Sequence, residues 1–421
     1  MMRLRLVLPL LALCGLLASC TRPDDGRVVV KFWAMGREGE VVTQLMPEFE
    51  RTHPGIRVEV QQLPWTAAHQ KLLTAFAGEA MPDVFQLGNT WVPEFHALKA
   101  IIQLDAYLAQ SAHIQRGDYF DGIWDTNVID GKLYGLPWYV DTRVMFYNRK
   151  LLAELGYRQP PTTWSEWMKA MEAVKRKVGP QNYAMLLPNE EYETLLGLAL
   201  QQDEPLLRDG GRYGNFRSAS FRRALQLYGE MFEKKLAPME RVSNVYHEFS
   251  MNFISFYFSG PWNIGEFRRR VPAAAQDTWM TARLPGPNGY SSAIAGGSSL
   301  AIASSSRHPK EAWQLVEYLS RTDVADKFNE LTGDMPPRRS NWEAPRLAKD
   351  PYARAFREQL EYVKPVPKVP EWENIVAAMR VMGERVAHNT ISVDDAVVEL
   401  DAEVDRILEK RRWMLDREQR Q

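Results

Sequence analysis

The segment Val28-Val29-Val30-Lys31-Phe32-Trp33 is a run of β-branched and aromatic residues that follows a polar stretch. This composition predicts a buried strand. Residues 34–40 contain two glycines and are expected to form a turn, while residues 41–51 place apolar side chains at helical spacing. Residues 56–63 alternate as a second strand. Strand and helix that alternate in this way favour an α/β fold with a mainly parallel sheet.

The same alternation continues along the chain. A helix, a strand and a helix are predicted at residues 67–77, 83–87 and 92–99. In an open α/β sheet the ligand lies at the carboxyl ends of the strands, where the loops gather. The loops that follow the first three strands, residues 34–40, 64–66 and 88–91, are therefore expected on the binding side.

Helices dominate the rest of the chain. Thr163 is a plausible N-cap and Glu166, three residues later, completes the pattern of a capping box. Further helices are predicted at residues 149–155, 216–235, 309–320 and 373–412, and further strands at residues 144–148, 253–258 and 294–303.

The N-terminus has the features of a secretory signal. Two arginines precede an apolar run at residues 6–17, which is shorter than the roughly 20 residues of a membrane-spanning helix. Leu17-Ala18-Ser19-Cys20 resembles a bacterial lipobox, in which Cys20 carries the lipid, residues 1–20 include the signal peptide and residues 21–27 form a tether. A plain signal peptide with an incidental cysteine is the alternative. Export with a lipid anchor on the cell membrane or outer membrane is expected.

Cysteine usage and motif spacing exclude several chemistries. The chain has two cysteines, Cys14 and Cys20, and both lie in the leader, so thiol catalysis, disulfide scaffolds and cysteine-ligated metal sites are excluded for the mature chain. The seven histidines show no metal-ligand spacing, and a phosphate-binding loop of the P-loop type is absent. No cofactor and no metal are expected.

Size and charge point to a two-lobed protein without a strong bias of charge. About 400 residues follow the leader, more than one core usually supports. The 52 basic and 53 acidic residues give a net charge of −1, so the chain lacks the excess of positive charge that is typical of nucleic-acid-binding proteins. The 13 tryptophans exceed ordinary usage and suit a carbohydrate cleft, although many must pack the core.

The order of several short motifs resembles a known family over essentially the whole mature chain. The carriers are Phe49-Glu50, His53-Pro54-Gly55-Ile56, Pro82-Asp83-Val84-Phe85, Gly131-Lys132-Leu133-Tyr134-Gly135-Leu136-Pro137, Tyr147-Asn148, Pro161-Thr162-Thr163-Trp164, Gly260-Pro261-Trp262 and Gly296-Gly297. Each motif is weak alone, but their joint order is similar to that of the ABC-importer solute-binding proteins for maltose, trehalose and other oligosaccharides.

The resemblance implies a two-lobe α/β periplasmic-binding-protein fold with discontinuous lobes and a hinge of crossing strands. Residues 28–140 and 294–340 would form the first lobe, and residues 141–293 and 341–421 the second. A sugar would bind between the lobes, and closure around it would present the protein to the transmembrane permease of the importer. A monomer that binds a small-molecule sugar and no nucleic acid is implied.

The resemblance also implies site residues. Glu38, Tyr139, Asp141, Tyr192, Trp262, Gly296, Gly297 and Arg338 occupy positions that match ligand contacts of the family, with Arg339 as a competitor of Arg338. A carboxylate accepts hydrogen bonds from sugar hydroxyls, and a guanidinium donates to adjacent oxygens. An exposed loop acid at Glu38, a hinge hydrogen bond at Asp141 and a core tyrosine at Tyr139 are the structural alternatives.

Predicted loops add tryptophans to the expected cleft. Trp33, Trp65, Trp91 and Trp138 are candidates for its lining, although a single tryptophan is more often part of the core. Among these, Trp65 and Trp91 lie in predicted strand-to-helix loops and Trp138 near the hinge.

Two departures from the family pattern leave the identity of the sugar undetermined. Gly88 stands where close relatives carry a carboxylate, and Ser298 stands where they carry an aromatic residue. Asn89 is a candidate to replace the carboxylate, because its amide offers both a donor and an acceptor.

Two other functions are alternatives to sugar binding for import. A secreted glycosidase would draw an acid and a nucleophile from Glu38, Asp141, Glu190 and Glu191, but no such pair stands out in the sequence. The same fold with a glycerophosphodiester or glycerol-3-phosphate as ligand would use arginines such as Arg37 and Arg338.

Overall fold

The computed structural model describes residues 25–187 and 193–418. The first lobe is built on a five-stranded sheet with the strand order β2-β1-β3-β14-β6. These strands are β1 (Val28–Met35), β2 (Ile56–Leu63), β3 (Val84–Gly88), β6 (Leu136–Val140) and β14 (Gly297–Ile302). Strand β1 runs parallel to β2 and β3, whereas β14 runs antiparallel to β3 and β6.

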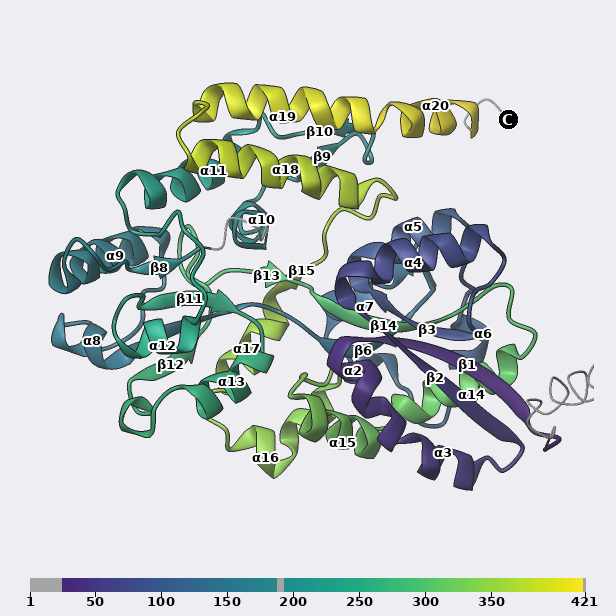
Figure 1. The fold of residues 1–421 in the computed structure, drawn as a ribbon. Coiled ribbons are helices and arrows are strands. Elements are labelled where there is room, and N and C mark those ends of the chain that lie inside the picture. The colour runs from purple at the N-terminus through teal and green to yellow at the C-terminus, as the bar shows by residue number, and fades with distance from the viewer. Residues whose placement is uncertain (1–24, 188–192, 419–421) are drawn as a thin grey trace, which may run out of the picture.

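The expectation of a mainly parallel sheet is therefore wrong for half of the strand pairs. The reason is the path of β14, which enters the sheet from the second lobe and runs back between β3 and β6. Helices cover both faces of the sheet (Figure 1). The helices of one face are α4 (Trp65–Ala77) and α5 (Val92–Ala97), and those of the other include α3 (Met46–Thr52), α14 (Pro309–Leu319) and α15 (Thr322–Thr332).

The predicted turn after β1 is instead the start of a short helix, α2 (Gly36–Val41). Gly36 has a φ of 48°, which lets the chain turn sharply from strand to helix. A Cβ at Gly39 would lie 2.7 Å from the carbonyl oxygen of Ala34, so α2 packs directly against the end of β1. The predicted helix at residues 41–51 is broken, because η1 (Val42–Gln44) precedes α3 and Pro47 lies in the first turn of α3.

Short elements complete the first lobe. They are η2 (Asn89–Trp91), α6 (Asp105–Leu108), η3 (Arg116–Asp118), α7 (Asp121–Asp125), β4 (Val128–Ile129) and β5 (Lys132–Leu133).

The second lobe is built on a four-stranded sheet with the strand order β12-β7-β11-β8. The strands are β7 (Val144–Asn148), β8 (Met185–Leu186), β11 (Phe256–Ser259) and β12 (Trp279–Ala282). Its helices are α8 (Arg149–Glu154), α9 (Trp164–Val178), α10 (Glu193–Leu200), α11 (Ala219–Glu233), α12 (Val245–Ser250), α13 (Trp262–Arg270), α16 (Pro345–Ala348), α17 (Arg354–Gln359), α18 (Trp372–Ala387), α19 (Val393–Ile407) and α20 (Glu409–Glu418). The remaining elements are β9 (Leu207–Arg208), β10 (Tyr213–Gly214), η4 (Ala273–Ala275), β13 (Ala293–Ile294), η5 (Arg339–Glu343), η6 (Leu360–Tyr362) and β15 (Val363–Lys364).

Local sequence signals account for several of these boundaries. The Thr163 side chain accepts a hydrogen bond from the backbone of Glu166, and the Glu166 side chain returns one to Thr163, so the predicted capping box at the start of α9 is confirmed. The helical region predicted at residues 373–412 is also confirmed, as three successive helices, α18, α19 and α20. Helices α18 and α19 lie beside α11 (Figure 1).

The chain passes between the two sheets three times. Strand β6 ends in the first sheet at Val140 and β7 begins in the second at Val144, while β13 and β14 form the return path. The backbone N–H of Val140 donates to the carbonyl of Met335 at 2.8 Å, which places the third passage beside the first. Two α/β lobes joined by crossing segments are the fold class predicted from the sequence, and this prediction is confirmed.

Among the helices of residues 25–187 and 193–418, none combines the length and the apolar character needed to cross a bilayer. The predicted signal peptide and Cys20 lie outside the described residues.

Candidate ligand-binding site

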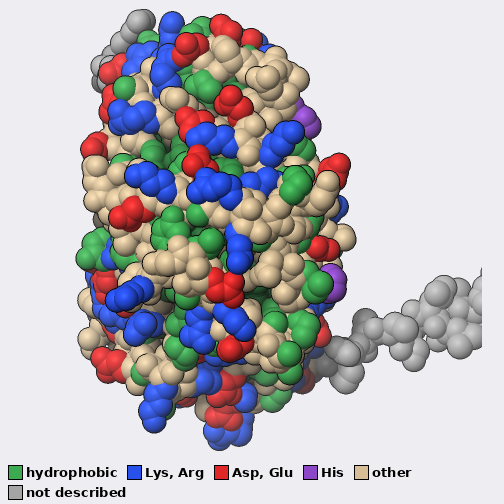
Figure 2. Space-filling view, turned by 90° about the vertical axis from the view of Figure 1, so that its left-hand side faces the viewer, with side chains coloured by type: hydrophobic (Ala, Val, Ile, Leu, Met, Phe, Trp, Pro, Cys, Tyr) green, Lys and Arg blue, Asp and Glu red, His purple; other side chains and the backbone are tan. Residues whose placement is uncertain are grey.

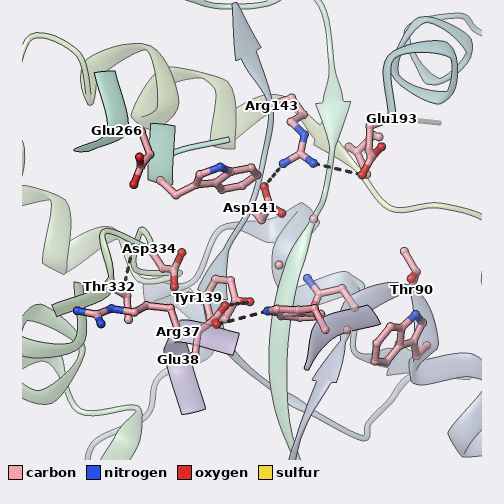
Figure 3. Close-up of a pocket in the computed structure, with 18 of the residues that line it drawn as sticks. Arg37, Glu38, Thr90, Tyr139, Asp141, Arg143, Glu193, Glu266, Thr332 and Asp334 are labelled. Carbon is pink, nitrogen blue, oxygen red and sulfur yellow. Dashed lines mark hydrogen bonds and ion pairs between the residues drawn. The ribbon is translucent and has the colours of Figure 1, made fainter. Parts of the chain in front are cut away.

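A cavity of about 1010 Å³ lies between the two lobes (Figure 3). The first lobe lines it with Glu38, Trp65, Asn89, Trp91, Tyr139 and Asp334, and the second with Arg143, Glu193, Trp262, Glu266 and Glu373. Its size is at the upper end of small-molecule sites, and aromatic rings and carboxylates converge in it. This chemistry suits a neutral ligand with flat faces and many hydroxyl groups.

Glu38 is held in place by a chain of buried polar groups. The Tyr139 hydroxyl donates to Glu38 Oε1 at 2.7 Å, and the Trp65 indole N–H points to Oε2 at 3.4 Å. The side-chain amide of Gln86 donates to the Tyr139 oxygen at 3.2 Å and accepts from the backbone N–H of Met35 at 2.7 Å. The carboxylate of Glu38 is thus oriented before a ligand arrives, and hydrogen-bond acceptor sites remain on it.

Three carboxyl groups share the centre of the cavity, and the pKa of each is raised. Burial raises the pKa of Glu38. Burial also raises the pKa of Asp141, where the charge of Arg143 acts in the opposite direction. The pKa of Asp334 is raised well above its usual value by burial and then by the charges of Glu38 and Asp141. Asp334 therefore takes up a proton more readily than an exposed aspartate does.

We expect Asp334→Asn to stabilise the fold at neutral pH. Because the pKa of Asp334 is raised in the folded state, its contribution to stability is complete below its usual pKa of 3.8 and is lost as the pH rises through the folded value. The difference in unfolding free energy between Asp334→Asn and the natural chain should therefore grow, on the order of 1 kcal/mol, from pH 4 to pH 7.5. Urea unfolding at both pH values measures this. Asp203→Asn on the surface is the control, and an equal difference at both pH values would contradict the expectation.

Arg143 ties the hinge to the second lobe. Its guanidinium forms a short ion pair with Asp141 and contacts Glu193 at 3.2 Å. The same guanidinium lies 4.7 Å from the centre of the Trp262 ring. A Cβ at Gly260 would lie 1.9 Å from this ring, so only glycine leaves room for it. Trp262 is therefore fixed with its ring on the wall of the cavity.

Two further tryptophans form the opposite wall. Trp65 and Trp91 meet edge to face with their ring centres 6.2 Å apart, and His69 lies 4.8 Å from Trp91. A Cβ at Gly88 would lie 3.2 Å from the Trp91 ring, so Gly88 leaves space for this tryptophan. Trp65 is 39% exposed although it lines the cavity, which leaves its face accessible to a ligand.

The double glycine lies where the crossing strands approach most closely. A Cβ at Gly296 would lie 2.2 Å from the carbonyl oxygen of Asp141. Gly297 has a φ of 131°, and a Cβ there would lie 2.3 Å from the carbonyl oxygen of Tyr139. Both glycines line the cavity, and the geometry of the hinge requires them as well.

The lobes also touch across the cavity. The Thr90 hydroxyl in η2 donates to Glu373 Oε1 in α18 at 2.8 Å. Nearby, His69 Nε2 lies 2.6 Å from Glu94 Oε2, and this partner raises the pKa of His69. Burial raises the pKa of Glu373. This hydrogen bond joins elements of the two lobes directly, without passing through the hinge.

Comparison with known proteins identifies the family. Residues 35–326 match the family described as bacterial extracellular solute-binding protein. The chain belongs to this family. A solved structure of the sugar-binding protein MalE from Xanthomonas citri is 53% identical, with a TM-score of 0.89 over 92% of this chain and 99% of that one.

More distant relatives include another binding protein and a receptor of the same fold. The diacetylchitobiose binding protein DasA of Streptomyces coelicolor is 25% identical over 83% of this chain and 84% of its own length. The GacH receptor of Streptomyces glaucescens is 21% identical, with a TM-score of 0.78 over 91% of this chain and 99% of that one, and shows the same fold. The family and these relatives are substrate-binding proteins rather than enzymes, so the prediction of a binding protein is confirmed and the glycosidase alternative is not supported.

The binding protein brings most of the predicted site residues together. Nine of them line the cavity: Glu38, Trp65, Asn89, Trp91, Tyr139, Asp141, Trp262, Gly296 and Gly297. Asn89 is 4% exposed, and its side-chain oxygen accepts a hydrogen bond from Ser299 at 2.9 Å. Ser298 is buried, and its hydroxyl donates to the Tyr139 hydroxyl at 3.2 Å. Ser298 thus helps to hold the tyrosine that donates to Glu38.

Two predicted ligand contacts lie outside the lining of the cavity. Trp138 is 2% exposed and stacks on Phe328 with ring centres 4.5 Å apart, because neighbouring residues of β6 point to opposite faces of the sheet. Arg338 contacts Asp118 at 2.6 Å and the Ser320 carbonyl at 2.8 Å, so its donors serve the fold. Both are corrections to the expected lining. Tyr192, Glu190 and Glu191 lie outside the described residues.

Sequence reasoning missed several charged residues of the cavity. Arg143, Glu193, Asp334 and Glu373 come from four separate segments. Arg143 has a recognisable signal, because residues two apart on an extended segment share a face and Asp141 was already a candidate. Glu193, Asp334 and Glu373 follow no motif, since the arrangement of the lobes brings them to the cavity.

Proposed function

We propose that this binding protein captures an α-linked glucose disaccharide or oligosaccharide, of the maltose or trehalose type, and delivers it to the permease of an ABC importer. The observation that carries the proposal is the pairing of opposed tryptophan walls with pre-oriented carboxylates in one cavity. The nonpolar faces of pyranose rings suit tryptophan surfaces, while their hydroxyls donate to carboxylates. The relative at 53% identity is a sugar-binding protein, which supports a sugar as the ligand.

The charges of the cavity weigh against a phosphate ligand. Arg37 pairs with Glu40 at 3.0 Å, Arg143 with Asp141 and Glu193, and Arg269 with Glu266. Glu38, Asp334 and Glu373 add further carboxylates to the lining. A phosphate group favours clustered arginines with available donors, so glycerol-3-phosphate and its diesters are disfavoured.

Capture would use closure of the lobes. The lining is shared between lobes that are joined by three strand passages, and Thr90 already contacts Glu373 across the gap. A hinge at the passages would release and retain the sugar, and the closed form would dock on the permease. We further propose that a monomer acts at the cell surface or in the periplasm, tethered by lipid on Cys20.

A fluorescence titration tests the proposed ligand. The 13 tryptophans include three in the cavity wall, so a bound sugar should change the emission of a chain that begins at residue 21. The ligands are maltose, trehalose, sucrose, longer α-glucosides and glycerol-3-phosphate. Saturable binding of an α-glucoside without product formation is expected. Binding of glycerol-3-phosphate alone, or slow release of glucose, would overturn the proposal.

We expect Thr90→Val to weaken sugar binding about fivefold. The substitution keeps the shape of the side chain and removes the 2.8 Å hydrogen bond to Glu373, a contact that favours the closed arrangement. A hydrogen bond of this kind contributes about 1 kcal/mol. Calorimetric titration measures the change. Thr74→Val, on the exposed side of α4, is the matched control. Unchanged or tighter binding by Thr90→Val would show that this contact does not favour closure.

A further inference from the structure

A second cavity, of about 740 Å³, lies in the second lobe and has no lining residue in common with the sugar cavity. It is bounded by α8 and the loop after it, by β12 at the edge of the sheet, and by α17. Tyr147, on the buried strand β7, and Tyr290 contribute phenol groups. The size is that of an ordinary small-molecule site.

The charge of this second cavity is strongly positive. Its cationic side chains are Arg149, Lys150, Arg158, Arg283 and Arg354, and its acidic side chains are Asp277 and Glu358. Among the described residues, the one ion pair within this set joins Arg354 to Glu358 at 4.0 Å. In the described part of the chain, no carboxylate lies within 4.0 Å of Lys150, Arg158 or Arg283. Five cations and two acids therefore line one cavity, and the lining carries a net positive charge.

Among these cations, Arg283 is held in place by aromatic rings and has a donor atom without a partner in the described residues. Its guanidinium lies 4.1 Å from the centre of the Tyr362 ring and 5.2 Å from that of Tyr290, so aromatic faces fix its plane. Its Nε atom is buried, and no hydrogen-bond acceptor for it is present in the described residues. Arg149, by contrast, donates through Nε to the carbonyl of Asp277 at 2.7 Å. A fixed guanidinium with unused donors is suited to a planar or tetrahedral oxyanion.

The two cavities therefore have opposite electrostatic character. Carboxylates face the sugar cavity and bind its arginines, whereas the second cavity has more cations than acids and only Arg354 of its described cations is in an ion pair. Helix α8, which contributes to the second cavity, lies at the end of the molecule that faces the viewer in Figure 2, where Lys and Arg side chains are interspersed with Asp and Glu. A neutral sugar has nothing to neutralise these cations, but a small polyanion does.

We propose that the second cavity binds a small anion that carries two or more phosphate or carboxylate groups. Arg283 holds one oxyanion, and Lys150, Arg158 and Arg354 surround the remaining charge. The tyrosine hydroxyls of the cavity supply further donors. The site works independently of the sugar cavity, so it gives the protein a second ligand that is unrelated to the transported sugar.

Calorimetric titration with two probes tests the proposal. Pyrophosphate and citrate are titrated separately into the chain that begins at residue 21, at 50 mM and at 500 mM sodium chloride. Saturable binding of at least one probe at low salt is expected, at least fivefold weaker at high salt because salt screens these charges. Tighter pyrophosphate binding assigns phosphate as the recognised group, and tighter citrate binding assigns carboxylate.

Charge-matched variants locate the site. Arg283→Gln and the more exposed Lys150→Gln should each weaken binding of the preferred probe at least tenfold. Arg346→Gln removes the same charge on α16, outside the cavity, and should leave binding unchanged. Circular dichroism and the unfolding temperature check that each variant folds. Absence of saturable binding to both probes, or equal weakening in Lys150→Gln and Arg346→Gln, would overturn the proposal.

Discussion

Glu38→Ala is expected to weaken sugar binding about 100-fold. The Glu38 carboxylate is the acceptor that the Tyr139 hydroxyl and the Trp65 indole hold in position at 2.7 and 3.4 Å. Its removal takes away charge-assisted hydrogen bonds from the sugar hydroxyls to the carboxylate. The loss is worth about 3 kcal/mol in binding free energy, and 1.4 kcal/mol corresponds to a factor of ten. Calorimetric titration of the sugar that binds the natural chain gives the ratio directly.

Two further variants separate binding from folding in the Glu38 experiment. Glu48→Ala removes an exposed carboxylate from α3, and it should bind as the natural chain does. Glu38→Gln keeps the size of the side chain and one acceptor oxygen, so its affinity should fall between those of the natural chain and Glu38→Ala. An affinity of Glu38→Ala within threefold of that of Glu48→Ala would remove Glu38 from the binding site.

Trp262→Ala is expected to weaken sugar binding about 30-fold. The ring lies on the cavity wall of the second lobe, fixed by Arg143 at 4.7 Å and by the space that Gly260 leaves. A tryptophan offers a large flat apolar surface, and losing its contact with a sugar ring costs about 2 kcal/mol. The affinity is measured by calorimetry, because the substitution also alters the fluorescence signal.

The position of the ring, rather than the number of tryptophans, should decide this effect. Trp413→Ala removes a tryptophan that is 57% exposed on α20, and it should bind sugar normally. Trp262→Phe keeps a flat ring and should retain more affinity than Trp262→Ala. If Trp262→Ala and Trp413→Ala bind equally well, the sugar does not stack on Trp262.

The sequence predicted the elements of the fold better than their arrangement. Strand β1 was visible in its run of β-branched residues, and the start of α9 in the Thr163 and Glu166 capping pair. The antiparallel insertion of β14 was not visible, because residues 297–302 look like any other buried strand. Its direction depends on a passage from the other lobe, which no local pattern records.

In the candidate site as well, the sequence predicted residues that depend on local elements better than residues that depend on the arrangement of the lobes. Residues near strand ends, such as Trp65 and Trp91, were accessible to reasoning about the carboxyl edge of an α/β sheet. Trp138 was assigned to the wrong environment, since a one-residue shift along β6 separates the cavity from the core, where Trp138 packs on Phe328. Glu373 lies in the first turn of α18 and reaches the cavity only because the second lobe is assembled from distant segments.

A crystal structure of the complex tests the central claim most directly. The crystals would be grown with the sugar that binds tightest in the titrations of maltose, trehalose and longer α-glucosides. The account predicts a sugar in the cavity between the lobes, with a hydroxyl in hydrogen-bond contact with Glu38 and a ring stacked on Trp262. A sugar bound elsewhere on the protein, with Glu38 and Trp262 free of contact with it, would contradict the account.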